Sequence, residues 1–224
     1  MNTTIQDQRF PTLETLTGEN EIIYLLTKPL EENLIKQEFT IQKNASLKLT
    51  IIDFSSGSLD FSLSLHLLEG ASVKVSLASI LTGNANKKYD ITTIHEEKDS
   101  VSLTKMAGIN CSSGFLKFLG SSKIKNGAKR SDTRQEGKIT NLTKEAKSEC
   151  SPALIIDEND VKASHGAALG AYNPDHLYYL MSRGLSLEES QKLITYGTLI
   201  PILEEVKEEE TLRMLKEVLG ALTL

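Results

Sequence analysis

Before residue 172, hydrophobic and polar residues alternate in short stretches of the chain. Residues 59–67 read Leu-Asp-Phe-Ser-Leu-Ser-Leu-His-Leu, and a similar period of two recurs over 47–52, 73–81 and 101–106. This period is typical of β-strands that bury one face. Small or turn-forming residues separate the stretches, so the pattern predicts a body built from many short strands.

A short phrase recurs where predicted strands begin. Asn44-Ala45-Ser46-Leu47 resembles Gly70-Ala71-Ser72-Val73, and Asn126-Gly127-Ala128-Lys129 echoes it weakly. Repeated turns of this kind suit either a β-sandwich or a solenoid that stacks rung upon rung. Aromatic residues make up only 5% of the chain, which fits the narrow interior of a parallel β-helix. We therefore favour the β-helix and keep the sandwich as the alternative.

The pattern becomes helical after residue 172. Asn173 and Pro174 predict the start of a first helix, which is expected to end at Gly184. Two domains follow from this change of pattern: a β-helix core over residues 1–172 and a C-terminal helical domain over residues 173–224.

Two more helices are expected in the second domain. Ser186 and Glu189 form a capping box for a helix that should close at Gly197. A further helical stretch is expected over residues 202–219. Three helices bury too little to form a bundle of their own, so they should dock on the β body or on another subunit.

Composition narrows the class of function. Thirty acidic and 25 basic residues give a net charge of −5, which argues against a nucleic-acid binder. The N-terminus has no signal-peptide pattern, and no stretch is apolar for long enough to span a bilayer. We expect a cytoplasmic protein that binds no nucleic acid and no membrane.

Signatures of catalysis are missing. No phosphate loop, H-E-x-x-H motif or nucleophile elbow occurs, which predicts a protein that is not an enzyme and binds no nucleotide by itself. Cys111 and Cys150 form no C-x-x-C pair, so neither a disulfide framework nor a zinc knuckle is expected.

Two residues could bind metal. His165 lies in a run of small residues between the last predicted strand, 153–156, and the first helix. Neutral imidazole is a common ligand of iron and zinc, although a structural histidine bonded to a backbone carbonyl is the alternative. Cys150 is expected to be exposed at a strand start, where its thiolate could be a ligand or the side chain a small hydrophobe.

Other polar residues carry weaker predictions. His66 is expected in a packed or rim position, and His176 in the exposed first turn of the first helix. The basic segment 117–138 could contact an anionic partner, and residues 207–210 should form a solvated helix face.

Three motifs, in order, resemble those of the SufB/SufD family. They are Gly-Ala-Lys-Arg-Ser-Asp-Thr-Arg-Gln-Glu-Gly-Lys over 127–138, the run ending in Asp-Val-Lys-Ala-Ser-His-Gly-Ala over 152–167, and Leu-Tyr-Tyr-Leu-Met-Ser-Arg-Gly with the acidic pair that follows over 177–190. The Ser164-His165-Gly166 element is similar to the SufD-like branch in particular.

The resemblance implies a right-handed parallel β-helix followed by a small helical domain, and a role in the SUF machinery that assembles iron–sulfur clusters. In that family SufB-like and SufD-like subunits pair through their β-helix ends, and the helical domains bind the ATPase SufC. The position of His165 is implicated there in transient handling of iron or a cluster, which makes His165 the first candidate site and Cys150 the second.

This chain departs from the family in two respects. It is shorter than usual members and is expected to lack their N-terminal helical region. It also has no evident counterpart of the cysteine on which SufB-like members build clusters. The sequence therefore predicts a reduced, SufD-like subunit.

Three hypotheses follow. The first is a noncatalytic scaffold that binds SufC through its helices and a SufB-like subunit, or itself, through the β-helix end. The second is a homodimeric iron or cluster carrier that uses His165. The third, an enzyme acting on polysaccharide, ranks last because the strands carry few carboxylates outward.

Overall fold

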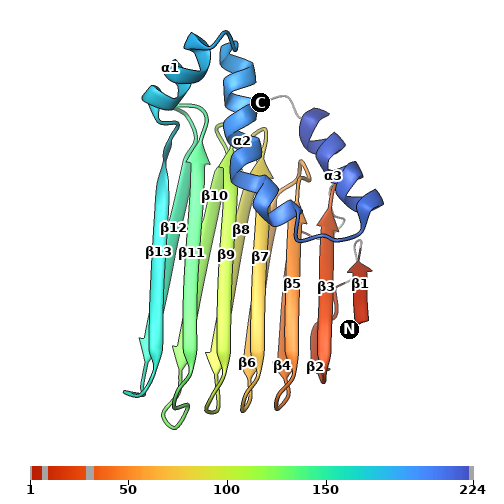
Figure 1. The fold of residues 1–224 in the computed structure, drawn as a ribbon, viewed down its shortest axis with the longest axis vertical. Helices are drawn as coiled ribbons and strands as arrows, with labels where there is room; N and C mark the ends of the chain where they lie inside the picture. Colours follow the sequence, from red (N-terminus) through yellow and green to blue (C-terminus); the bar gives the residue numbers. More distant parts are fainter. Residues whose placement is uncertain (1, 7–9, 29–32, 222–224) are drawn as a thin grey trace.

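The computed structural model describes residues 2–6, 10–28 and 33–221 (Figure 1). The strands that it describes form two parallel sheets. Sheet A contains β1 (Asn2–Gln6), β3 (Glu19–Leu26), β5 (Ser46–Asp53), β7 (Ser72–Leu81), β9 (Val101–Asn110), β11 (Asp132–Asn141) and β13 (Lys162–Ala171). Sheet B contains β2 (Leu13–Leu16), β4 (Leu34–Ile41), β6 (Leu59–Leu67), β8 (Asn86–His95), β10 (Phe115–Ile124) and β12 (Lys147–Ile156).

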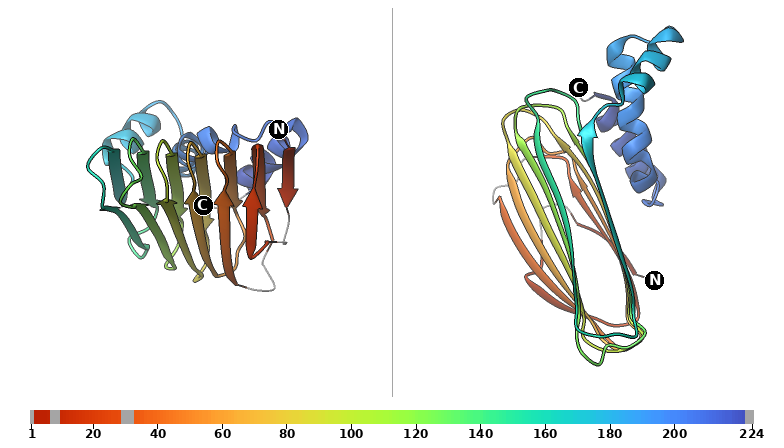
Figure 2. Two further views of the ribbon diagram at one scale, coloured as in Figure 1. Left: turned by 90° about the horizontal axis from the view of Figure 1, so that it is seen from below. Right: turned by 90° about the vertical axis from the view of Figure 1, so that its left-hand side faces the viewer.

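The chain coils between these sheets, because each strand pairs with the strand two places later. The result is a flat parallel β-solenoid whose two sheets face each other across a narrow interior (Figure 2). Ser46 pairs with Ser72, so the first two copies of the repeated phrase occupy the same corner of successive rungs. The β-helix prediction is confirmed and the sandwich is excluded.

The backbone conformation at this corner explains why the short sequence phrase recurs. Asn44, Gly70, Asp99 and Arg130 precede the strands of successive rungs, and each has a positive φ, between 57° and 67°. Asn and Asp tolerate the left-handed region better than most residues, and Gly enters it at no steric cost. The weaker echo at 126–129 lies upstream of this corner, which Arg130 and Ser131 occupy in that rung.

Three helices follow the solenoid: α1 (Pro174–Ser182), α2 (Leu187–Leu203) and α3 (Glu209–Ala221). Asn173 caps α1 by accepting a hydrogen bond from the Asp175 amide (2.8 Å), as predicted. The capping box of Ser186 and Glu189 at the start of α2 is also confirmed. No described helix is long and apolar enough to cross a lipid bilayer.

The predicted end of the second helix is wrong. Helix α2 continues through Gly197 and Pro201 to Leu203, and α3 begins at Glu209 rather than at 202. Leu199, Ile202 and Leu203 are fully buried. Their burial is worth several kcal/mol, whereas an interior Gly costs about 1 kcal/mol, so packing overrides the local signal.

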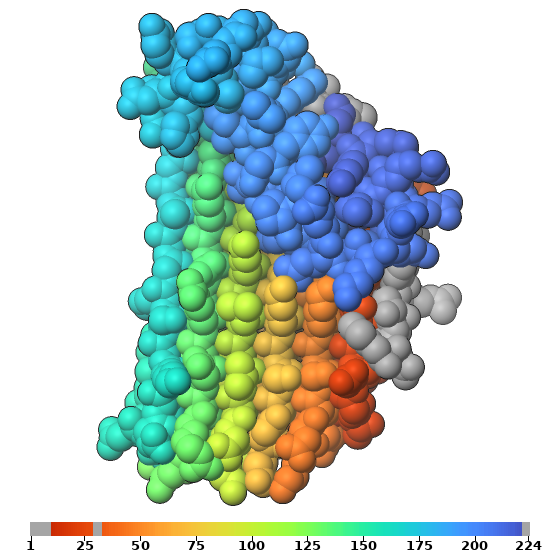
Figure 3. All heavy atoms as spheres, in the orientation of Figure 1, coloured from red at the N-terminus to blue at the C-terminus, as the bar shows by residue number. Residues whose placement is uncertain are grey.

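The helices dock on the β body. Leu199, Ile202 and Leu215 share one core cluster with Ile52 and Ile109 on the outer face of sheet A. Helices α2 and α3 cover one half of that face and leave the other half open (Figure 3). The chain changes from strand to helix between Ala171 and Pro174, where the boundary at residue 172 was predicted, although the helices share a core with the sheet.

Glu205, in the loop between α2 and α3, links the helices to sheet A. The backbone oxygen of Glu205, between α2 and α3, accepts a hydrogen bond from Lys48 Nζ (2.8 Å). Its carboxylate accepts one from Ser76 Oγ (3.0 Å) and pairs with Lys74 (3.0 Å). Three strand residues therefore hold the turn that reverses the chain between the two docked helices.

Candidate functional site: the open end of the solenoid

The last rung, β12 and β13, leaves one end of the solenoid uncovered. β13 pairs with β11 and β12 with β10, and no described strand lies on their other sides. Such edges carry unpaired backbone N–H and C=O groups, which can bind another strand. Ile155 and Leu169 are each 48% exposed on these two strands. We call this surface the open end.

His165 lies at the open end. It was expected in a segment between strand and helix, but it belongs to β13 and pairs with Gln135 of β11. Gln135 faces the interior and is 1% exposed, so His165 continues an inward-facing column and is itself exposed. Among the described residues no hydrogen bond or ion pair involves its imidazole.

Cys150 differs from its prediction. It lies within β12 rather than at a strand start, and it is half-buried rather than exposed. Its sulfur fills the space beside Gly137, where a Cβ would clash with it. Burial raises the pKa of the Cys150 thiol, which favours the protonated form and makes it a poor spontaneous ligand.

His165 and Cys150 therefore belong to the same rung but to opposite sheets. Both occupy inward register positions, His165 above Gln135 and Cys150 above Phe118. Within the described part of the chain, no cluster of three His, Cys, Asp or Glu side chains could hold a metal ion. The described residues of the open end thus provide an exposed histidine and a half-buried thiol, but not a complete set of metal ligands.

A network of buried polar side chains lies beneath the open end. His95 is fully buried, with Nδ1 2.7 Å from Ser100 Oγ and Nε2 2.9 Å from Ser102 Oγ. Burial lowers the pKa of His95 to about 4, so the imidazole is neutral at physiological pH. The network continues to Gln135 through Thr133 and Ser122.

A second buried polar cluster was not predicted. Lys87 and Asp53 are fully buried and pair at 2.8 Å, and Tyr89 donates a hydrogen bond to Asp53 (2.5 Å). Lys87 also donates to the carbonyls of Ser55 and Ile80. Desolvation lowers the pKa of Lys87 and raises that of Tyr89, but the contacts with Asp53 oppose the shift at Lys87. No local pattern distinguishes Lys87 from Lys88, which is only partly buried.

The remaining candidates lie away from the open end. His66 is half-buried on the outer face of sheet B, between Glu38 (3.3 Å) and Glu96 (2.7 Å). His176 is exposed on α1, as predicted. Much of the charge in the basic segment is paired, through Lys117–Glu149, Lys125–Glu96, Arg130–Asp99 and Arg134–Glu136. These pairs weaken the prediction that the segment contacts an anionic partner.

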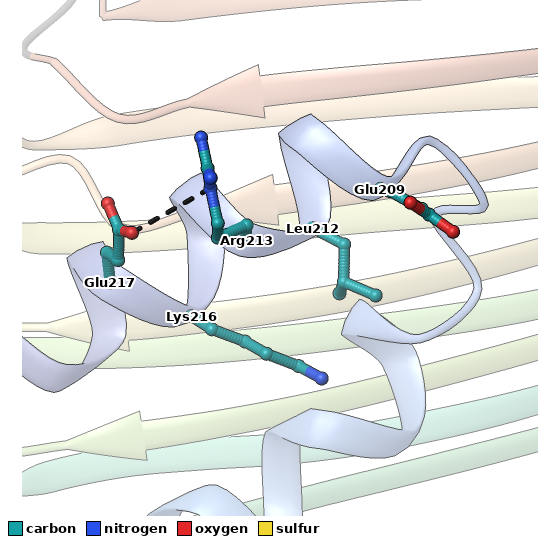
Figure 4. Close-up of a pocket in the computed structure, with 5 residues that line it drawn as sticks. All are labelled: Glu209, Leu212, Arg213, Lys216 and Glu217. Atoms are coloured by element: carbon teal, nitrogen blue, oxygen red, sulfur yellow. Dashed lines mark ion pairs between the residues drawn. The ribbon is translucent and has the colours of Figure 1, made fainter.

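The helices carry further surface features. α1 has no buried residue, and Tyr178 and Tyr179 are 76% and 55% exposed. A shallow pocket of about 420 Å³ lies along α3 and is lined by Glu209, Leu212, Arg213, Lys216 and Glu217 (Figure 4). A groove of about 490 Å³ lies between Gly197–Pro201 of α2 and the outer face of β9, β11 and β13.

Fold and site together define a parallel β-solenoid with an uncapped C-terminal end and docked helices. A family model, "SUF system FeS cluster assembly, SufBD core domain", matches residues 31–198. The chain belongs to this SufBD family, which takes part in iron–sulfur cluster assembly, and the predicted resemblance is confirmed.

Curated relatives agree with this assignment. The chain is 35% identical over 143 residues to the iron–sulfur cluster assembly protein SufD of Bacillus subtilis, a match that covers 63% of this chain and 33% of the relative. It is 32% identical over 80 residues to SufD of Escherichia coli, which covers 34% of this chain and 19% of the relative. A SufBD family protein of Staphylococcus saprophyticus is 23% identical over 188 residues, or 81% of this chain and 39% of the relative. The chain thus spans less than half the length of these relatives.

Sequence reasoning missed Gln135 and His95 as parts of the site. The signal for Gln135 is the column that contains Leu49, Val75, Thr104, Gln135 and His165, which recurs at intervals of one rung. His95 lies on β8 in the other sheet, outside this column. Only the strand register reveals that column, because the number of residues per rung changes along the chain.

Proposed function

We propose that this chain is a noncatalytic scaffold subunit of the SUF machinery, which pairs through its open end with a SufB-like subunit or a second copy. The observation that supports the pairing most directly is the pair of uncovered strand edges, β12 and β13, at one end of the solenoid. A parallel solenoid buries each rung against its neighbours, and its last rung gains the same burial from a partner strand.

In this proposal His165 is a ligand for iron, which is cargo rather than a resident cofactor. The imidazole is exposed and has no described partner, so a ring nitrogen is available. The paired subunit supplies the further ligands, because His165 and Cys150 alone are too few for a stable site.

The helices are proposed to bind a SufC-like ATPase. Tyr178 and Tyr179 project from α1, a helix that buries none of its residues on this chain. Exposed tyrosines are typical anchors of protein interfaces. ATP hydrolysis then belongs to the partner, in keeping with the missing phosphate loop.

Pairing is tested by co-expression with SufB-like and SufC-like subunits followed by anaerobic purification. Leu169→Lys places a charge on the open end, and we expect it to weaken pairing at least ten-fold, about 1.4 kcal/mol, because the charge would lose water on burial. Val101→Lys is the matched control, since Val101 is similarly exposed (46%) but lies away from that end. Equal pairing by both variants would contradict the proposal.

The role of His165 is tested in the same complex. His165→Ala should leave the complex intact and lower its iron and sulfide content severalfold, whereas His176→Ala, in exposed α1, should change neither. Unchanged iron and sulfide in His165→Ala would assign the histidine a structural role and leave the scaffold proposal standing.

A further inference from the structure

A continuous hydrogen-bonded chain of buried side chains leads from the interior to the last rung. We call it the hydroxyl chain. Its links are His95 Nε2–Ser102 Oγ (2.9 Å), Ser102 Oγ–Thr133 Oγ1 (2.7 Å), Thr133 Oγ1–Ser122 Oγ (2.7 Å), and the bond from Gln135 Nε2 to Ser122 Oγ. Gln135 Nε2 also donates to the carbonyl of Ala153 on β12 (3.2 Å), so the chain ends on the last rung itself.

The two ends of the hydroxyl chain determine its direction. An amide nitrogen can only donate, so Ser122 accepts from Gln135, and its own proton is directed to Thr133 Oγ1 (2.7 Å) or to Thr93 Oγ1 (2.8 Å). At the other end Ser100 Oγ donates to the Glu97 carbonyl (3.1 Å), and therefore accepts from Nδ1 of His95. A neutral imidazole has one donor and one acceptor. In this arrangement the proton of His95 is on Nδ1, and the hydroxyls of the chain all have partners.

Gln135 is the residue of the hydroxyl chain that neighbours both strands of the last rung, β12 and β13. Its amide bonds to β12, and its register partner on β13 is His165. Neighbouring strands lie about 4.8 Å apart, so the side chains of a register pair on the same face are adjacent. Its Oε1 is buried without a hydrogen-bond partner, in space left free by Gly120, where a Cβ would lie 2.8 Å away.

We propose that Gln135 is a positioning residue of the open end: its amide sets β12 at Ala153, and its side chain packs beside the register position of His165. The hydroxyl chain holds the amide in this orientation, because a reversed amide would put two acceptors, Oε1 and the Ala153 carbonyl, face to face. One side chain therefore fixes the spacing of the last two strands and the setting of the candidate ligand. This inference rests on the proposed role of the open end.

Gln37 provides a matched control. It is also buried (4% exposed), its Nε2 also donates two bonds, to Tyr24 Oη (2.9 Å) and the Pro11 carbonyl (3.0 Å), and its Oε1 is also unpartnered. It lies on β4, near the other end of sheet B. Gln37→Met and Gln135→Met remove the same groups at the same burial, but only the second lies beside His165.

The test reads the strand and the imidazole directly. Deuterium uptake is measured over residues 153–156, and ring ¹⁵N shifts of His165, assigned with His165→Asn, report its tautomer ratio. In Gln135→Met we expect uptake over 153–156 to be about five-fold faster, as loss of the hydrogen bond to the Ala153 carbonyl predicts. We also expect the tautomer ratio of His165 to change, because the polar side chain at the neighbouring register position is replaced by an apolar one. Gln37→Met should change neither.

Two results would overturn the inference: unchanged uptake and tautomer ratio in Gln135→Met, or equal changes in Gln37→Met. Should Gln135→Met fail to fold, Thr133→Val interrupts the hydroxyl chain without altering Gln135. It should produce smaller changes of both signals, and unchanged signals would again overturn the inference. This measurement does not involve a partner subunit. A negative result would therefore overturn the role of Gln135 without contradicting the proposed pairing through the open end.

Discussion

The interior of the solenoid has two chemically different regions on one backbone pattern. Two inward register columns of sheet A are aliphatic on β5 and β7 and polar on β9 and β11. They contain Leu47, Val73, Ser102 and Thr133, and Leu49, Val75, Thr104 and Gln135. In the early rungs these columns add to the apolar core, whereas in the later rungs they add hydrogen bonds between side chains to it.

Apolar and polar rungs contribute differently to the stability of the fold and to the precision of its geometry. A buried Leu or Val contributes about 1.5–3 kcal/mol whatever its exact orientation, whereas a buried hydrogen bond contributes about 1 kcal/mol and only in one arrangement. The polar rungs are adjacent to the open end, where His165 and Cys150 lie. The apolar rungs supply cohesion that depends less on exact geometry.

The largest expected effect concerns the buried ion pair of Asp53 and Lys87. Asp53→Ala leaves the Lys87 ammonium buried and unpaired, and should lower the free energy of unfolding by about 3–5 kcal/mol. Combining it with Lys87→Met should restore at least half of the loss. Urea denaturation at pH 7 measures both. Lys43→Ala, which removes an exposed pair with Glu69, is the control and should change the free energy of unfolding far less than Asp53→Ala.

The next effect is the pH dependence of the polar region. The pKa of His95 is about 4 in the folded protein and near 6.5 when unfolded, so between these values the unfolded chain binds the extra proton. This contribution is complete above pH 6.5 and is lost as the pH falls toward 4, about 3 kcal/mol in all. Urea denaturation from pH 8 to 4 should show a slope that His95→Asn lacks. The same slope in both proteins would contradict this prediction.

The smallest expected effect concerns two opposite substitutions, at Val73 and at Thr133, in the same register column of sheet A. Val73→Thr buries a hydroxyl in the apolar region, and Thr133→Val removes the partner of Ser102 and Ser122. Each should cost about 1–3 kcal/mol, although both exchange nearly isosteric side chains. Thermal unfolding compares them. A neutral Val73→Thr would mean that the two regions do not differ in the way proposed.

The sequence predicted the strands and the first helix starts because their signals are local. Alternation marks β6, the left-handed corner residues mark the rungs, and Asn173 and Ser186 mark helix starts. β13 has little such signal, since Gly and Ala dominate it. It is a strand because β11 provides a template, and for that reason His165 was placed in a connecting segment.

The polar interior could not be predicted either. In β9, Val101 and Leu103 face outward, whereas Ser102 and Thr104 are buried. Hydrophobic and polar residues alternate in β9, but here the hydrophobic residues face outward and the polar residues face the interior. The buried hydroxyls are tolerated because residues on other rungs hydrogen-bond to them. Lys87, on β8 of sheet B, is buried for the same reason, with its partner Asp53 three strands earlier, on β5 of sheet A. These assignments depend on contacts between distant residues.

The pairing of each strand with the strand two places away has a kinetic consequence. Because each rung is stabilised by its neighbours, cooperative unfolding is expected to spread along the axis rather than through the whole body at once. The aliphatic rungs are the natural nucleus, and order should propagate from them toward β13. The rung that carries His165 would then be the last to form and the first to fray, so a subunit that binds there would complete the folding of this one.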